Sequence, residues 1–177
     1  MESMIEFVHQ RIKKHKYQNG IDFTMGNGHD TLFLSDYCHH VYSYDIQSLA
    51  LNNTKELVKR KKNITLFLKS HEYFDEDVQD FEVGIFNLGY LPGGNHECVT
   101  QYETTLKTIE KALEHLVKGG CLHVVVYIGH DQGKESTNLD AYFRSLDHKL
   151  YNVAKFEMMN KTIRHMLLLL KKGKSNQ

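Results

Sequence analysis

The sequence predicts an α/β fold, with an open, mostly parallel seven-stranded sheet that carries helices on both faces. Three observations predict it. Short apolar runs alternate with segments whose apolar residues keep helical spacing, which is the pattern of consecutive βα units. Residues 121–128 form a continuous apolar run with three consecutive valines, as expected for a strand covered on both faces. Two final strand-like segments, joined by the polar stretch 160–164, predict an antiparallel hairpin at the sheet edge.

Each element is predicted from its own pattern of apolar and turn residues. The expected strands are residues 21–25, 41–46, 64–68, 81–86, 121–128, 151–159 and 165–171. The expected helices are residues 1–17, 30–37, a segment after the second strand that runs through Arg60, 72–78, 100–117 and 134–148. In the helix at 100–117 the apolar positions Leu106, Ile109, Leu113 and Leu116 keep helical spacing, and Gly119 with Gly120 predicts its end.

Length and composition indicate one globular domain over residues 1–177. Hydrophobic residues make up 41% of the chain and charged residues 25%, which is ordinary for a globular protein. The 22 Lys and Arg residues balance the 22 Asp and Glu residues, so no overall basic field indicates nucleic acid. The longest apolar run, residues 166–170, is far too short to cross a bilayer. We therefore expect a cytoplasmic protein.

Cysteine and histidine usage favours neither disulfides nor a metal. Cys38, Cys98 and Cys121 form no C-x-x-C pair, and three cysteines cannot all pair with one another, which indicates a reducing compartment. The twelve histidines are scattered, without H-E-x-x-H or a comparable ligand spacing. We expect no metal site.

A glycine loop after the first strand is the first candidate binding element. Residues 24–31 read T-M-G-N-G-H-D-T, and the candidate cofactor contacts in them are Gly26, Asn27, Gly28 and His29. The glycines allow positive φ and a close backbone approach to a ligand, and a helix begins directly afterwards. A dinucleotide fingerprint would place a third glycine where Thr31 stands, so S-adenosylmethionine is favoured over NAD. A plain glycine turn is the alternative.

Polar residues after the second and third strands extend this candidate site. Asp45 stands at the end of the second strand, 17 positions after Gly28, and is placed to accept hydrogen bonds from both ribose hydroxyls, with Gln47 beside it. An aspartate at a strand end also serves as a helix cap. After the third strand, His71 and Glu72 stand where an adenine would be contacted, and His71 is equally suited to capping the next helix.

The fourth strand leads into the most informative loop of the chain. Residues 81–94 read F-E-V-G-I-F-N-L-G-Y-L-P-G-G, which resembles the Asn-Pro-Pro-Tyr-type loop of amino-group methyltransferases. In that loop the Asn carbonyl oxygen accepts a hydrogen bond from the amine to be methylated, and the aromatic ring packs on the substrate. The resemblance implies that Asn87 and Tyr90 are catalytic and that Asn87 and Leu88 also border the cofactor. His130, after the fifth strand, is a candidate proton relay or a structural loop residue.

Together these motifs resemble the YtqB-like class I methyltransferases of Gram-positive bacteria, of MnmM type. The resemblance rests on T-M-G-N-G-H-D-T-L-F-L, Y-D-I-Q, F-N-L-G-Y-L-P-G-G and Y-x-G-H, which span residues 24–135 in the expected order. It implies a Rossmann-like class I methyltransferase fold. It also implies S-adenosylmethionine-dependent N-methylation of the aminomethyl group of 5-aminomethyl-2-thiouridine at tRNA wobble position 34. An acidic residue is more usual in this family where Asn95 and His96 stand.

Recognition of an anticodon stem-loop would need side chains on which a flipped base can stack. Tyr90, Tyr142 and Arg144 are the candidates, and a half-buried aromatic and a surface charge are the alternative reading of the last two. With zero net charge, RNA binding must use a local patch. The leucines at 167–170 in the final hairpin hint at a homodimer edge.

Three other functions remain open on the sequence. A class I methyltransferase that acts on rRNA or on a small-molecule amine fits the cofactor motifs equally well and the neutral charge better. A non-catalytic S-adenosylmethionine-binding module is disfavoured because both Asn87 and Tyr90 are present. A pyridine-nucleotide oxidoreductase is disfavoured by the missing third glycine.

Overall fold

The computed structural model describes residues 3–89, 102–128, 134–158 and 164–173 of the 177-residue chain. Its centre is a seven-stranded sheet in the order β3-β2-β1-β4-β5-β7-β6. The strands are β1 (Tyr17–Asp22), β2 (Cys38–Asp45), β3 (Ile64–Leu68), β4 (Phe81–Leu88), β5 (Leu116–Ile128), β6 (Tyr151–Glu157) and β7 (Arg164–Lys172). The helices are α1 (Met4–Ile12), α2 (His29–Ser35), α3 (Ser48–Val58), the 3₁₀ helix η1 (His71–Glu76), α4 (Tyr102–His115) and α5 (Lys134–Ser145).

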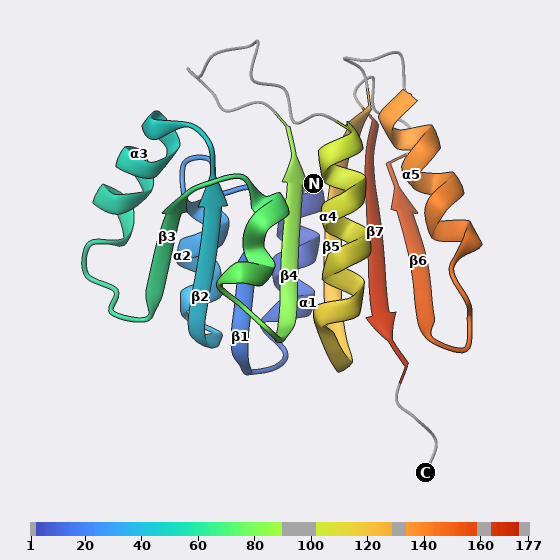
Figure 1. The fold of residues 1–177 in the computed structure, drawn as a ribbon, viewed down its shortest axis with the longest axis horizontal. Helices are drawn as coiled ribbons and strands as arrows, with labels where there is room; N and C mark the ends of the chain where they lie inside the picture. Colours follow the sequence, from blue (N-terminus) through green and yellow to red (C-terminus); the bar gives the residue numbers. More distant parts are fainter. Residues whose placement is uncertain (1–2, 90–101, 129–133, 159–163, 174–177) are drawn as a thin grey trace.

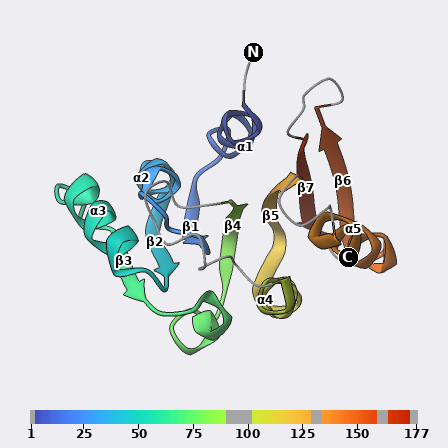
Figure 2. The same ribbon diagram turned by 90° about the horizontal axis from the view of Figure 1, so that it is seen from above.

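Strands β1 to β5 pair in parallel, and β7 pairs antiparallel with both β5 and β6 (Figure 1). Figure 2 shows α1 and α2 on one face of the sheet and η1, α4 and α5 on the other. This confirms the predicted fold class, a mostly parallel sheet closed by an antiparallel pair. Because β1 to β5 run the same way, their carboxyl ends meet at one edge, where such sheets bind ligands. Among the described residues, no helix has both the length and the apolar character that crossing a membrane requires.

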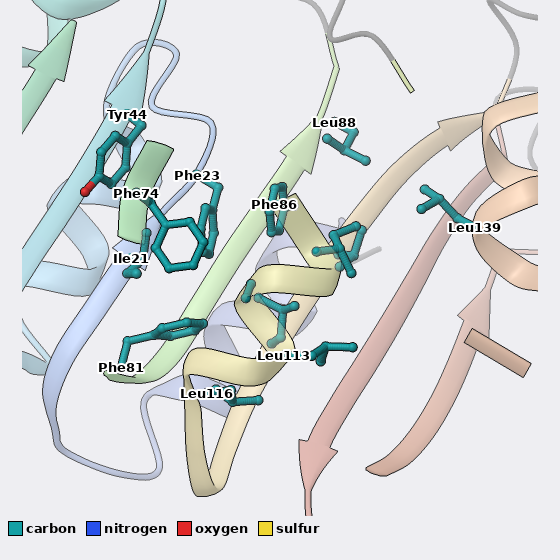
Figure 3. Close-up of a cluster of buried hydrophobic side chains, with 14 of the residues drawn as sticks. Ile21, Phe23, Tyr44, Phe74, Phe81, Phe86, Leu88, Leu113, Leu116 and Leu139 are labelled. Atoms are coloured by element: carbon teal, nitrogen blue, oxygen red, sulfur yellow. The ribbon is translucent and has the colours of Figure 1, made fainter. Parts of the chain in front are cut away.

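Two apolar cores hold the helices on the sheet. On the α4 face, Phe23 stacks on Phe86 with ring centroids 4.2 Å apart, and Phe74 meets Phe23 edge to face at 5.2 Å (Figure 3). On the opposite face, α1 buries Val8 and Ile12 in a cluster that also holds residues of α2, β2 and β4. Alternation along β4 therefore directs Phe86 to one core and its neighbours Ile85 and Asn87 to the other face.

The end of α4 differs from the sequence prediction. The helix stops at His115, and Gly119 and Gly120 lie inside β5 rather than at a helix end. The register passes from Phe81↔Leu116 to Val83↔Cys121, so a bulge of residues 117–120 stands opposite one residue of β4. Gly119 has φ 83°, and a Cβ at Gly120 would lie 2.8–3.0 Å from three heavy atoms. The glycines are required by this bulge.

The first helix and strand and the final hairpin also differ from the sequence prediction: α1 ends at Ile12 rather than at residue 17. The first strand begins at Tyr17, four residues before the expected start. The apolar pattern did not reveal this start, because only the last three residues of the strand are buried. The final hairpin forms as predicted, but β7 lies between β5 and β6, so residues 167–170 are inside the sheet and β6 is the edge. The hint of a dimer edge at these leucines therefore loses its basis.

Candidate active site

The glycine loop lies between β1 and α2 at the carboxyl edge of the sheet. Gly26 and Gly28 both have positive φ, at 51° and 82°. A Cβ on Gly28 would lie 2.6–2.9 Å from three side-chain atoms of Thr54 on α3, so this position admits no side chain. Thr54 Oγ1 also donates to the Gly26 carbonyl at 3.2 Å. The loop is thus held close to α3, and Asn27 is fixed by the amide of Asn53 at 2.9 Å.

Asp45 joins this loop to the end of β2, as its sequence position predicted. Its Oδ2 accepts from the Gly26 amide at 3.0 Å, and its Oδ1 accepts from the Gln47 amide at 2.9 Å. Gln47 is the residue at the N-cap of α3, and its side chain makes no capping bond. A carboxylate offers about four acceptor positions, so Asp45 retains acceptor capacity toward a ligand beyond these two bonds. Ile46, between the two residues, is 60% exposed.

His71 lies at the start of η1, facing the end of β1. A carbonyl can only accept, so His71 Nδ1 carries the proton in its 2.9 Å bond to the Phe23 carbonyl. Its Nε2 is then an acceptor, shielded from solvent and without a partner among the described residues. Burial lowers the pKa of His71 and keeps the ring neutral. Ser70, rather than His71, caps η1 by accepting from the Glu72 amide.

Asn87, the residue before the last one of β4, contacts two neighbours from the glycine loop and α2. Its amide N–H donates to Thr24 Oγ1 at 2.7 Å, and its side-chain Nδ2 donates to Asp30 Oδ2 at 3.0 Å. Its Oδ1 is shielded from solvent and finds no hydrogen-bond partner in the described part of the chain. A buried acceptor without a partner costs about 1–3 kcal/mol, and a ligand donor would offset that cost.

Three aspartate side chains, Asp22, Asp30 and Asp45, lie close to one another at this edge. Asp22 is fully buried and accepts from Thr24 N at 3.1 Å and from Thr31 Oγ1 at 2.7 Å. Burial, followed by the charge of Asp30, raises the pKa of Asp22 to about 7, and Asp45 adds to the rise. Such a site disfavours further negative charge and favours a cation. The described residues include no cluster of three His, Cys, Asp or Glu side chains that would hold a metal ion.

The structure brings together part of the residue set predicted from sequence. Those that meet at the carboxyl edge are Gly26, Asn27, Gly28, His29, Asp45, Gln47, His71, Glu72, Asn87 and Leu88. The side chain of Leu88 belongs to the α4-side core, so its backbone is what a ligand at the edge would meet. Tyr90 and His130 lie outside the described residues.

Tyr142 and Arg144, the candidates for stacking on a flipped base, lie near the end of α5, away from the carboxyl edge. Helix α5 begins at that edge, and Arg144 lies in its last turn, where it pairs with Asp140. The ring of Tyr142 packs on the core, and burial raises its pKa to about 12. Any RNA contact at these two residues would be made along the outside of α5.

Five residues that border the site were missed by the sequence reasoning. They are His9, Thr24, Asp30, Ile46 and Tyr127. Gly89 lies against the Tyr127 ring, since a Cβ there would be 3.2 Å from its Cδ2. Two of these residues could have been predicted from the sequence. Asp30 stands within the glycine motif itself, and Ile46 is an isolated apolar residue between Asp45 and Gln47. His9 could not have been predicted in this way, because its contact partner Asp30 lies 21 positions away in sequence.

Comparison with known proteins places these features in a family. A family model described as "Putative rRNA methylase" matches residues 41–172. SMU.1697c, "a putative methyltransferase from streptococcus mutans in complex with SAH", is 35% identical with a TM-score of 0.89, over 97% of this chain and 99% of that one. A "PUTATIVE RRNA-METHYLASE" from Clostridium thermocellum is 31% identical with a TM-score of 0.92, over 97% and 98%.

A curated plant relative is similar over most of this chain. The Arabidopsis thaliana "tRNA (mnm(5)s(2)U34)-methyltransferase, chloroplastic" is 35% identical over 168 residues, which cover 85% of this chain. The chain spans 61% of the length of that relative.

Proposed function

The chain belongs to the "Putative rRNA methylase" family, and we propose that it is an S-adenosylmethionine-dependent methyltransferase acting on an amine of RNA. The observation that carries the proposal is the buried Asn87 Oδ1, which has no hydrogen-bond partner among the described residues, at the edge where the glycine loop and Asp45 meet. A class I methyltransferase fold, relatives described as methylases and a relative solved with SAH support the cofactor.

The residues at the carboxyl edge fit S-adenosylmethionine. Asp45 is the proposed acceptor for the ribose hydroxyls, and the glycine loop with positive φ allows the backbone to approach the ligand. His71 Nε2, a neutral acceptor without a partner in the described residues, suits the amino group of adenine. The negative charges of Asp30 and Asp45, which raise the pKa of the neighbouring Asp22, suit a sulfonium cation.

Asn87 is proposed to position the amine. When bound, the cofactor supplies an electrophilic methyl group, which a neutral amine attacks in line through its lone pair. Asn87 Oδ1 accepts an N–H of that amine and so turns the lone pair toward the methyl carbon. Positioning of this kind accounts for much of the acceleration that an enzyme gives such a reaction. The negative edge also attracts an alkylammonium before it loses its proton.

We propose that the acceptor is the aminomethyl group of 5-aminomethyl-2-thiouridine at tRNA position 34, which becomes 5-methylaminomethyl-2-thiouridine. The Arabidopsis relative, named for this nucleoside, and the resemblance of residues 81–94 to an amine-binding loop support it. An rRNA acceptor is the second candidate, because the matching family is described as an rRNA methylase and the chain has no net charge.

The test incubates the protein and S-adenosylmethionine with tRNA and with rRNA from cells that lack this gene. Mass spectrometry of the nucleosides should show one added methyl group on the wobble uridine of the tRNA. Asn87→Ala protein serves as the control for a contaminating activity. Methylation of rRNA or of a free amine, with tRNA unchanged, would show that the tRNA assignment is wrong.

A further inference from the structure

Helix α1 reaches the candidate site through a chain of three side chains. His9 on α1 lies 2.7 Å from Asp30 Oδ1 through its Nε2. Asp30 in turn accepts from Asn87 Nδ2 through its other oxygen, Oδ2, at 3.0 Å. These hydrogen bonds join three segments that lie far apart in sequence. The last residue, Asn87, carries the side-chain oxygen that has no partner in the described residues.

Asp30 leaves the Asn87 amide a single orientation. An ionised carboxylate has only acceptors, so the NH₂ side of the amide must face it and Oδ1 must face away. Rotating the amide by half a turn would set two oxygens against each other at this buried position, since Asp30 is 7% exposed. That rotated amide would also point an N–H at an incoming amine and bind the lone pair that has to attack.

His9 fixes the carboxylate in the same way. Its ring is stacked on Phe33 with centroids 3.7 Å apart and planes 5° apart, which holds Nε2 in the direction of Asp30. The His9 side chain is 23% exposed, so the ring closes the pair off from most of the solvent. With one oxygen bound to His9, Asp30 presents the other to Asn87.

We propose that Asp30 and His9 are positioning residues, which hold the Asn87 amide with its oxygen toward the amine acceptor. The inference rests on the proposed function, since it assigns a purpose to the Asn87 oxygen. Neither residue touches the reacting atoms. Asp30→Asn keeps the size of the side chain but adds a donor, so both orientations of the Asn87 amide become acceptable.

The orientation is tested first, without reference to activity. The side-chain amide of Asn87 is identified in ¹H–¹⁵N spectra by its loss in Asn87→Ala. In the wild type, its protons should exchange slowly with solvent because one is bound to a buried carboxylate. In Asp30→Asn the two Asn87 amide proton signals should change their chemical shifts, and these protons should exchange faster with solvent. An Asn87 amide signal that is the same in both proteins overturns the inference.

Kinetics then test the consequence for turnover. Asp30→Asn should lower kcat roughly ten- to a hundredfold, while cofactor affinity and the KM for RNA change by less than about threefold. His9→Phe, which keeps an aromatic ring on Phe33 without the donor, should lower kcat several-fold, and His9→Gln, which keeps a donor, should restore most of it. Equal rates for His9→Phe and His9→Gln would overturn the role of His9.

His40→Phe is the matched control for the histidine variants. His40 is also a partly buried ring bound through Nε2, at 2.8 Å from Thr65 Oγ1, and packs against Tyr42, but it lies on β2 away from the site. This variant should leave kcat unchanged. The proposed function and the proposed role of Asp30 and His9 can fail separately. Absence of methyl transfer by the wild-type protein to any RNA or amine would contradict the proposed function. The Asn87 amide signal would still show whether Asp30 fixes the orientation of that amide.

Discussion

Asn87 combines the two kinds of evidence available at the level of single residues. Its sequence context indicates a residue that binds the amine to be methylated. In the structure its side-chain NH₂ group is bound to Asp30, and its side-chain oxygen is buried without a partner in the described residues. A buried polar atom left unpaired is rare in native proteins and calls for an explanation. A hydrogen bond to the substrate provides one.

Asn87→Ala should lower turnover by orders of magnitude and leave cofactor affinity nearly unchanged, because its proposed interaction belongs to the aligned reacting complex. Single-turnover rates and calorimetric titration with S-adenosylmethionine check this. Near-normal turnover in the variant would remove Asn87 from the mechanism.

Asp45 should matter for binding instead. Asp45→Ala removes charge-assisted hydrogen bonds worth about 1.5–3 kcal/mol, so affinity for S-adenosylmethionine should fall about ten- to a hundredfold. Asp36→Ala is the control, because Asp36 is an exposed carboxylate at the end of α2 that pairs with Lys61. Unchanged calorimetric affinity in Asp45→Ala, with the fold intact, would contradict the ribose assignment.

At the level of elements, the junction between the glycine loop and α2 depends on close packing against α3. Gly28 is both the N-cap of α2 and the point where Thr54 approaches. The same junction holds the backbone that is proposed to face the cofactor, so its stability and its function are linked.

Gly28→Ala should lower the free energy of unfolding by roughly 2 kcal/mol or more, from the positive φ and from the clash with Thr54. Urea unfolding measures it. Thr54→Gly in the same chain should recover the part due to the clash and leave the part due to φ. If the free energy of unfolding lost in the double variant Gly28→Ala/Thr54→Gly equals the sum of the losses in the two single variants, Thr54 does not clash with the new Cβ and this part of the prediction is wrong.

At the level of the whole molecule, charge is distributed unevenly around a neutral chain. Three aspartates lie at the carboxyl edge, whereas the described lysine-rich stretches at the ends of α1 and α3 precede β1 and β3 and so lie at the opposite edge. Lys61 there pairs with Asp36, and Lys59 with Glu56. If the proposed RNA substrate binds here, groups other than these lysines must contact its phosphates, and its binding should weaken as salt rises.

The buried Asp22 should make stability fall as pH rises. Its pKa is raised from 3.8 to about 7 in the folded protein, chiefly by burial, so the folded state holds a proton that the unfolded chain releases between these values. Its contribution is therefore complete below about pH 4 and is lost as pH rises through about 7. Urea unfolding across this range should show a smaller loss of stability in Asp22→Asn than in the wild type.

Asp36→Asn, at an exposed carboxylate, should follow the wild type over the same range. If Asp22→Asn and the wild type show the same dependence of stability on pH, the raised pKa of Asp22 is wrong.

The sequence by itself determined the fold class and the residues local to each strand end. Period-two and helical patterns are local, so the strand at Ile64–Leu68 was predicted to the residue. Gly28, Asp45 and Asn87 were found from their positions at or just after the ends of predicted strands. Parallel strands bring such residues to one edge, which is why the candidate site could be assembled before the structure.

Only the tertiary structure decided the contacts that join distant segments. The bulge at Gly119 and Gly120 depends on the register between β4 and β5, and a glycine pair reads the same at a helix end and inside a strand. The placement of β7 inside the sheet depends on strand pairing. The bond from His9 to Asp30 depends on where α1 packs, because a hydrogen bond is set by distance in space and local sequence does not encode it.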